Sequence, residues 1–413
     1  MASIRLMEPV THFLTGACIG RAGFNRKTAY ATLAAALAAE AADMDVFWGF
    51  AGPVDELKHH RGITHTFWAI PVIAAVIVGM VWLIDLIRRN RHSRAPSPPT
   101  EFVPSSSSGP ADERGGIGRA QRITIYEADL APARKKRAAP RAPGQQPIRW
   151  GWLYLTTFIA ASTHILLDWT NNYGVRPFFP FNPRWYAGSF MFIAEPVIWG
   201  LFFLAFFMPW VLGLADREMG VRRQRFRGRG WAIFALAAIT ALGCWRWSEH
   251  ARARTLVDNV EITSEPVTRM AFEPYPINPF HWHGILETPH FYQTAEIDTR
   301  TGAIASDPAT DVMYKPADTP AVEAAKRTPL GEVYLDWGSW AVVRDIGQQQ
   351  APGVSPPSLP PGRAWTTVEF TDLRFDYAFT SGRGPARSVL GGWVYIVDGH
   401  DDAGEIMSGR EQH

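Results

Sequence analysis

Seven histidines and aspartates near the ends of apolar segments are the residues of this chain best suited to chemistry. Ionisable side chains beside hydrocarbon are costly, so several of them at one membrane depth require a function. A metal site is the simplest function that uses all of them, because imidazole and carboxylate groups are common ligands of zinc and related metals. The candidate ligands are His12, Asp43, Asp45, His60, His65, His164 and Asp168.

The strongest local pattern is the i, i+4 spacing of His164 and Asp168 in the stretch STHILLDWTNNYG. On a helix both side chains project from one face and can share a metal. Taken alone, the pair is more typical of a buried hydrogen bond. A single histidine on an apolar helix, such as His12, is also usually just hydrogen-bonded.

The remaining candidates lie where regular structure is expected to stop. His60 and His65 bracket an Arg-Gly turn before an apolar run, and alone they would indicate a polar interfacial loop. Asp43 and Asp45 are two positions apart and cannot face one way on a regular helix. Either the helix ends there, or one of the two acids supports a ligand instead of being one.

Apolar segments that could hold these residues are concentrated before residue 248. The run Thr66–Ile87 has 22 residues and one acid near its end, so as a helix it is long enough for the roughly 30 Å of a bilayer core. Two shorter segments, Pro9–Gly20 and Thr28–Phe50, are expected to form a helical hairpin; a soluble helical subdomain is the alternative. Three further spans are predicted at Trp150–Trp169, Ser189–Ala215 and Gly230–Trp247.

Charge distribution predicts the orientation of these helices. The net charge of +2 gives no case for nucleic acid as a partner. Basic residues cluster at 88–94, 134–149 and 217–229, which the positive-inside rule places in the cytoplasm, although binding to nucleic acid or anionic lipid is the alternative for these clusters. All seven candidate ligands then fall at the outer face.

We therefore expect a multidomain chain, with an α-helical transmembrane domain and a C-terminal β-rich soluble domain outside the membrane. Alternating stretches at Thr366–Phe379 and Gly392–Val397 indicate strands, and DTRTG at Asp298–Gly302 indicates a hairpin turn. The expected boundaries are 1–89 for the hairpin and first long span, 90–148 for a disordered cytoplasmic linker rich in Pro, Ser, Gly and Arg, 149–247 for three spans, and 248–413 for the β domain.

A second histidine pair, His281 and His283, lies at the start of the β domain. On a strand both would point to one face, with Trp282 turned to the other. We expect a structural role, and a second metal site is the alternative.

The motifs together resemble the membrane-bound metal-dependent hydrolase family, whose bacterial members include a LexA-regulated inner-membrane protein. The matching elements are PVTHFLTG, the Ala-rich helix ending in DMD, HRGITHT, and HILLDWTNNYGVRP, over roughly residues 7–90 and 150–200. The family is thought to be related to zinc-dependent phospholipases C and single-strand nucleases. The resemblance implies that Asp45 is a ligand or supports one. It implies six further ligands: His12, Asp43, His60, His65, His164 and Asp168.

The expected function is a bacterial inner-membrane hydrolase that uses two or three Zn²⁺ on a phosphoester, such as a lipid headgroup. Asp45 or Glu195 would accept the proton, Glu195 standing in for the relatives' closing H-x-x-x-E motif, which has no match here. Arg61 would contact the phosphate, or would simply be a turn residue. The competing function is a non-enzymatic transporter or scaffold with a structural metal or proton-binding site.

Overall fold

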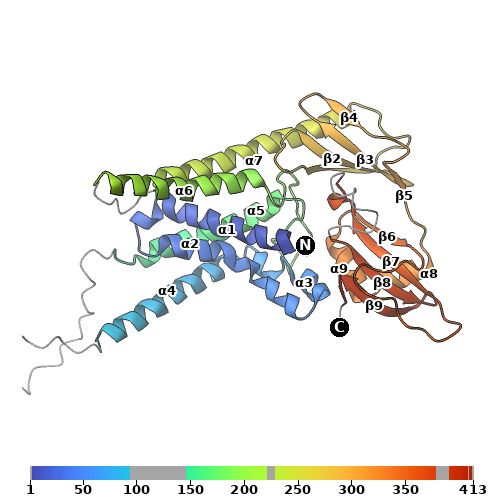
Figure 1. Ribbon diagram of the computed structural model, residues 1–413, viewed down its shortest axis with the longest axis horizontal. Helices are drawn as coiled ribbons and strands as arrows, with labels where there is room; N and C mark the ends of the chain where they lie inside the picture. Colours follow the sequence, from blue (N-terminus) through green and yellow to red (C-terminus); the bar gives the residue numbers. More distant parts are fainter. Residues whose placement is uncertain (1, 94–145, 221–227, 378–389, 408, 412–413) are drawn as a thin grey trace, which may run out of the picture. The chain divides into compact units, whose positions relative to one another are not determined.

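The computed structural model describes residues 2–93, 146–220, 228–377, 390–407 and 409–411 (Figure 1). Its N-terminal part is helical and its C-terminal part consists of antiparallel sheets, which confirms the predicted fold class. Most of the predicted linker, and the basic residues of the loop between the last two long helices, lie outside the described residues. The described start of that linker is helical to Ser93.

Seven α-helices of the described chain precede the sheets, with short 3₁₀ segments between some of them. The α-helices are α1 (Ala2–Ala22), α2 (Ala31–Glu40), α3 (Pro53–His59), α4 (Ala69–Ser93), α5 (Trp150–Thr170), α6 (Pro196–Glu218) and α7 (Arg229–Asp258). The 3₁₀ segments are η1 (Phe24–Arg26), η2 (Ala41–Phe50) and η3 (Ile63–His65). The chain comprises two compact units, Met1–Val78 with Pro147–His413, and Gly79–Gln146. The candidate site and the β domain belong to the first.

The hairpin of α1 and α2 forms because glycine and alanine let the two backbones approach closely. A Cβ atom added at Gly16 would lie only 2.3 Å from the carbonyl oxygen of Ala35, and one at Gly20 only 2.5 Å from Cα of Thr32. The facing side of α2 consists largely of buried alanines. Small residues four positions apart are typical of close helix pairs in membranes.

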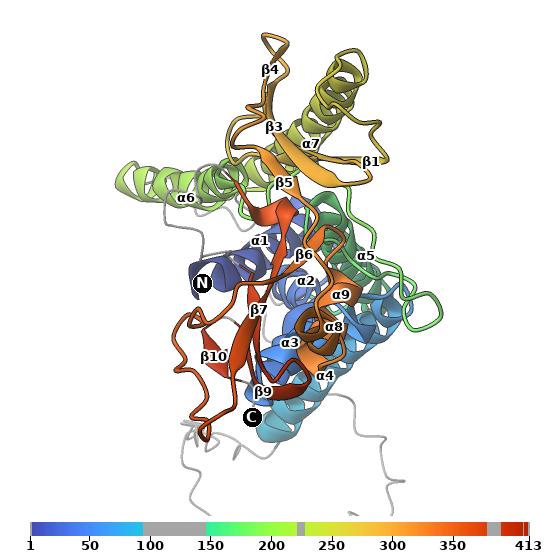
Figure 2. The same cartoon turned by 90° about the vertical axis from the view of Figure 1, so that its right-hand side faces the viewer.

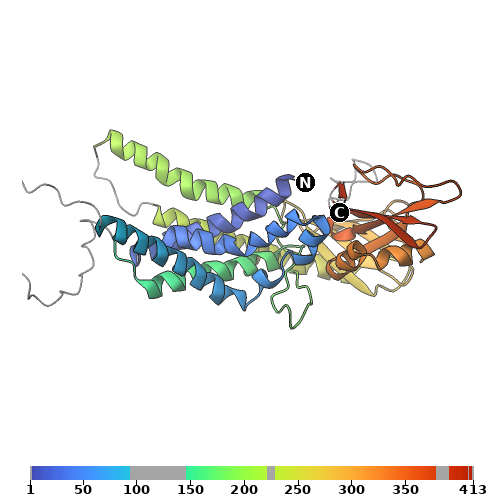
Figure 3. The same cartoon turned by 90° about the horizontal axis from the view of Figure 1, so that it is seen from below.

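Helix α5 packs against both arms of this hairpin (Figures 1 and 3). Its buried residues recur every three or four positions, from Leu153 through Ala160 to His164 and Asp168. This period puts one stripe of the helix against α1 and α2. The last turn of the stripe carries the histidine and aspartate that the sequence singled out.

Among the described residues, three helices are long and apolar enough to cross a membrane. They are Ala69–Asn90, Pro196–Glu218 and Arg229–Asp258. The predicted span at Trp150–Trp169 is a helix of the expected length but is not among the three, since its buried stripe carries hydroxyl, imidazole and carboxylate groups. The number of membrane passes, and the side on which the β domain lies, stay predictions. The predicted last span ended at Trp247, whereas α7 continues to Asp258.

The C-terminal part contains two antiparallel sheets, which lie toward the viewer with α8 and α9 in Figure 2. The first pairs β1 to β4 in order, with β5 also on β3; the second has the order β10-β9-β8-β7-β6. Helices α8 (Pro320–Lys326) and α9 (Pro329–Trp337) pack on the second sheet. The strands are β1 (Arg269–Pro274), β2 (His281–Glu287), β3 (Phe291–Asp298), β4 (Ala303–Ala305), β5 (Val312–Tyr314), β6 (Ala341–Asp345), β7 (Trp365–Asp372), β8 (Gly392–Val397), β9 (Asp401–Met407) and β10 (Arg410–Glu411).

Most of the strand predictions are confirmed. β8 has the predicted bounds, and the DTRTG turn joins β3 to β4 with Gly302 at φ 76°. The stretch predicted from Thr366 to Phe379 is strand only as far as Asp372, where the chain enters a short 3₁₀ turn. Residues from 378 onward in that stretch lie outside the described residues.

Candidate metal centre

Four donor atoms from η2, η3 and the C-terminal end of α5 converge. They are Nε2 of His65, Nε2 of His164, Oδ1 of Asp43 and Oδ2 of Asp168. The two imidazole nitrogens are 2.9 Å apart. Each carboxylate oxygen lies 3.3–3.4 Å from both nitrogens. We refer to these four residues as the donor centre.

The distances within the donor centre are close to those between neighbouring ligand atoms of a transition metal. Zinc–ligand bonds of about 2.0–2.2 Å place neighbouring ligand atoms of a tetrahedron about 3.3–3.6 Å apart. Four of the five distances above are 3.3 or 3.4 Å, and the fifth is shorter. Oδ2 of Asp43 and Oδ2 of Asp168, the latter facing the centre, are buried without a hydrogen-bond partner in the part of the chain that the structure describes. Such atoms need a cation or a proton.

Hydrogen bonds on the far side of each imidazole aim its Nε2 atom at the centre. Nδ1 of His164 donates to the carbonyl oxygen of Ala39 at 2.6 Å. Because a carbonyl only accepts, this bond leaves the Nε2 lone pair of His164 free to bind a metal. Nδ1 of His65 lies 3.2 Å from Oδ2 of Asp45. Carbonyl and carboxylate partners of this kind orient histidine ligands in metal sites.

Asp45 therefore supports the centre instead of joining it. Its Oδ2 accepts the backbone N–H of Arg61 at 2.7 Å, and its Oδ1 lies 3.4 Å from Nδ1 of His60. Burial raises the pKa of Asp45, but hydrogen bonds from His60 and His65 outweigh it and hold the pKa well below its usual range. The two aspartates diverge because α2 ends at Glu40 and both lie in η2. This geometry combines the two sequence alternatives, since the helix ends before the pair and one acid supports a ligand.

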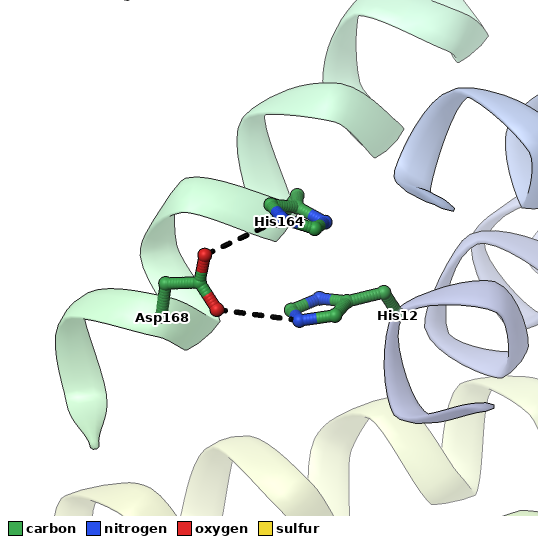
Figure 4. A group of neighbouring side chains, drawn as sticks. All are labelled: His12, His164 and Asp168. Atoms are coloured by element: carbon green, nitrogen blue, oxygen red, sulfur yellow. Dashed lines mark ion pairs between the residues drawn. The ribbon is translucent and has the colours of Figure 1, made fainter. Parts of the chain in front are cut away.

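Asp168 links the donor centre to His12 and Arg61. While its Oδ2 faces the centre, its Oδ1 lies 3.3 Å from Nε2 of His12 and 3.0 Å from the guanidinium of Arg61. The His12 ring stacks on the His164 ring at 3.8 Å (Figure 4). His12, His164 and Asp168 thus form a second, overlapping group of possible ligands.

Arg61 is buried and its guanidinium is committed to the protein. Besides Asp168 it donates to Oδ1 of Asn171 at 3.2 Å and to the carbonyl oxygen of Gly174 at 2.6 Å. Its backbone has φ 52°, a left-handed conformation held by the bond to Asp45. The predicted contact between Arg61 and a phosphate is therefore less favoured by this geometry than a positioning role.

His60 lies apart from the donor centre and faces a cavity of about 190 Å³. Its side chain is 26% exposed, against 0% for His65. Asp43 and Asp45 also line this cavity, and apolar residues provide most of the remaining wall. Val46, Leu57 and Tyr173 contribute from the helical part, and Leu390 and Met407 from the β domain.

Glu195 is close to His12 but is engaged elsewhere. The two residues line one small cavity, yet Oε2 of Glu195 forms a buried ion pair of 2.8 Å with Arg246. Oε1 accepts the backbone N–H of Ile277 at 3.1 Å. The carboxylate is thereby tied to α7 and the β domain, which favours a structural role over the predicted proton transfer.

The other histidine pair has the arrangement expected for a structural role. His281 and His283 both contact Glu296 on the neighbouring strand, at 3.0 and 3.1 Å, while Trp282 is fully buried on the opposite face. No group of three possible ligands is found here among the described residues.

Sequence reasoning missed the turn that follows α5. Asn171 and Tyr173 both contact Arg61, Asn171 by a hydrogen bond and Tyr173 with its ring face at 4.8 Å. The available signal was their position in the motif HILLDWTNNYG, directly after Asp168.

Comparison with known proteins identifies a family. A family model described as YdjM inner membrane protein matches residues 7–253, more than half of the chain, including every residue of the donor centre. No curated protein and no solved structure matches the chain. The β domain after residue 253 lies outside the family match.

Proposed function

Because the chain belongs to the YdjM inner membrane protein family, we propose that it is a membrane-embedded metal-dependent hydrolase acting on a phosphoester, such as a lipid headgroup. One observation carries this proposal. Asp43 belongs both to the donor centre and to the wall of the cavity of about 190 Å³. A cation held by the centre would therefore face a space that admits another molecule, which a purely structural metal does not need.

The surroundings of the cavity favour a lipid. Val46, which lines it, is half exposed and belongs to an exposed apolar run in η2. Within this run Phe47 is 57% exposed, Trp48 49% and Phe50 90%. An apolar surface of this kind next to membrane helices is typical of segments that lie in the lipid interface. A lipid would reach the cavity past η2 without leaving the membrane.

The donor set suits zinc, because it mixes imidazole and carboxylate ligands. When bound, such a cation would polarise a phosphoryl oxygen and make a water molecule more acidic. The histidines and carboxylates of the donor centre would hold it. Asp45 and the Ala39 carbonyl would keep the two imidazoles turned toward it.

His60 is the best placed residue to move a proton. It is partly exposed in the cavity and its Nδ1 faces Asp45. A histidine held by a carboxylate on one nitrogen can accept or donate a proton with the other. We therefore assign proton transfer to His60, with Asp45 orienting it, in preference to Glu195.

The test is hydrolysis by the purified full-length protein in vesicles of phosphatidylethanolamine and phosphatidylglycerol, with zinc present, measured as release of phosphorylated headgroup. The variant His60→Gln should retain metal and lose turnover, whereas His65→Ala should lose both. The matched control is His283→Gln, which removes a buried histidine outside the donor centre.

Turnover that is equal in wild type and His65→Ala would contradict the hydrolase proposal. Metal uptake without hydrolysis of either lipid would contradict a lipid phosphoester as substrate and favour a structural or transport role for the metal.

A further inference from the structure

A turn of the chain links the β domain to the donor centre. This turn, Asn171–Tyr173, directly follows α5 and therefore continues from Asp168. One of its sides contacts Arg61, through Asn171 and Tyr173. Its other side contacts the β domain, chiefly at Arg374.

Arg374 is itself held rigidly. It is 3% exposed and forms two hydrogen bonds with Asp372, from Nε to Oδ1 at 2.9 Å and from an NH2 group to Oδ2 at 2.8 Å. Its remaining terminal nitrogen donates to the carbonyl oxygen of Asn172 at 2.9 Å. The Asn172 side chain in turn donates to the hydroxyl of Tyr377 at 3.0 Å. Paired guanidinium and carboxylate groups of this kind have a fixed geometry.

A stack of side chains runs parallel to these hydrogen bonds. The Arg374 guanidinium lies 4.9 Å from the centre of the Trp337 ring, and Trp337 lies 4.8 Å from Tyr173. The Tyr173 ring also contacts Arg61, whose guanidinium carbon lies 4.8 Å from the ring centre. Two routes, one of hydrogen bonds and one of rings, thus join Arg374 to Arg61.

Through Arg61, both routes lead to the proposed ligand Asp168. Arg61 holds Oδ1 of Asp168 at 3.0 Å, and the other oxygen of the same carboxylate belongs to the donor centre. A rotation of this carboxylate would change the distance from its Oδ2 to both imidazole nitrogens. The position of Arg61 therefore controls the geometry of the centre.

We propose that the β domain sets the geometry of the metal centre through Arg374. The guanidinium of Arg374 holds the Asn171–Tyr173 turn, and this turn holds Arg61 against Asp168. The inference rests on the proposed metal site but goes beyond it, since Arg374 lies outside the family match. Arg374 is a positioning residue, and the β domain is a required part of the centre.

The test uses Co²⁺, whose visible absorption reports ligand geometry, on the purified full-length protein. We would compare wild type with Arg374→Ala and Arg374→Lys and measure the Co²⁺ dissociation constant by competition with a chelator. The matched control is Arg344→Ala, which removes an arginine paired with Glu369 in the same sheet. Thermal unfolding followed by tryptophan fluorescence checks that each variant is folded.

We expect Arg374→Ala to weaken Co²⁺ binding about tenfold or more and to change the absorption spectrum, as loss of a ligand's support usually does. Arg374→Lys should restore part of the affinity, and Arg344→Ala should leave affinity and spectrum unchanged. If Arg374→Ala does not fold, Tyr173→Leu removes the ring route from the helical side and should alter the spectrum in the same direction.

A spectrum and affinity equal to those of cobalt-loaded wild type in folded Arg374→Ala, or in Tyr173→Leu, would overturn the role of the β domain. A wild-type protein that takes up no cobalt would instead contradict the metal centre itself.

Discussion

The Nε2 atoms of His65 and His164 lie 2.9 Å apart, although 99 positions separate the two residues in the chain. A carboxylate oxygen of Asp43 and one of Asp168 each lie 3.3–3.4 Å from both nitrogens. Two lone pairs and two negative charges repel one another unless a cation or a proton lies between them. This juxtaposition is the main reason to expect a metal at the donor centre.

The two aspartates of η2 should behave differently when they are neutralised. Asp43→Asn removes a donor of the centre, so we expect the zinc content of the purified protein to fall below half of the wild-type value. Asp45→Asn leaves the donor atoms in place and weakens the contacts of Asp45 with His60, Arg61 and His65, so the zinc content should be kept at excess metal while affinity falls about 10- to 100-fold. Elemental analysis and chelator competition measure the two effects. The reverse order of severity would show that Asp45 is the ligand.

The close approach of α1 and α2 should be required for both stability and metal binding. In Gly16→Val the added atoms would meet the backbone of Ala35, so we expect a destabilisation of about 1–3 kcal/mol. Because His12 lies one turn earlier on α1, metal affinity should fall as well. The control is Gly151→Ala, where an added Cβ meets nothing within 4 Å. Thermal unfolding with and without zinc provides the measurement, and equal stability of the two variants would count against this packing.

Stability of the β domain should depend on the ionisation of Glu273. Burial raises the pKa of this carboxyl to about 8, whereas in the unfolded chain it is near 4.5. Between these values the folded state holds a proton that the unfolded state has released, so stability falls as pH rises from 4.5 to 8 and then levels off. The slope is about 1.4 kcal/mol per pH unit at most.

Glu273→Gln removes this titration. The variant should unfold at a higher temperature than wild type at pH 8 and at nearly the same temperature at pH 5. Glu296→Gln should have the opposite effect and unfold at a lower temperature than wild type. Hydrogen bonds from His281 and His283 outweigh burial and lower the pKa of Glu296 to about 2, so its ionised form stabilises the folded state. A wild-type stability that rises steadily from pH 5 to pH 8 would be inconsistent with a buried, protonated Glu273.

The local part of the site could be predicted from sequence because it depends on short-range periodicity. The spacing of His164 and Asp168 fixes them on one helical face, and the spacing of Asp43 and Asp45 requires them to diverge. The role of each side chain in the site could not be predicted, because it depends on its hydrogen-bond or ion-pair partner. Ala39 is the partner of His164, Asp45 that of His65, and Arg61 that of Asp168. Together with the bond from the Arg61 backbone to Asp45, these contacts join residues 16 to 125 positions apart.

The contribution of the β domain was beyond sequence reasoning for the same reason. Arg374 reaches Asn172 across 202 positions, and nothing in the local pattern of either residue indicates the contact. For Glu195, the sequence shows only that it lies at the end of a predicted span. Its ion pair with Arg246 depends on the packing of α6 beside α7, which the local sequence does not indicate (Figure 1).

Metal analysis of the purified full-length protein tests the proposed metal centre most directly. Wild type and the double variant His65→Ala, His164→Ala would be purified without chelators, and the zinc bound per chain would be measured by mass spectrometry. We predict at least one equivalent in wild type and almost none in the double variant, with His281→Gln, His283→Gln unchanged from wild type. Full occupancy in the double variant His65→Ala, His164→Ala would contradict the metal centre.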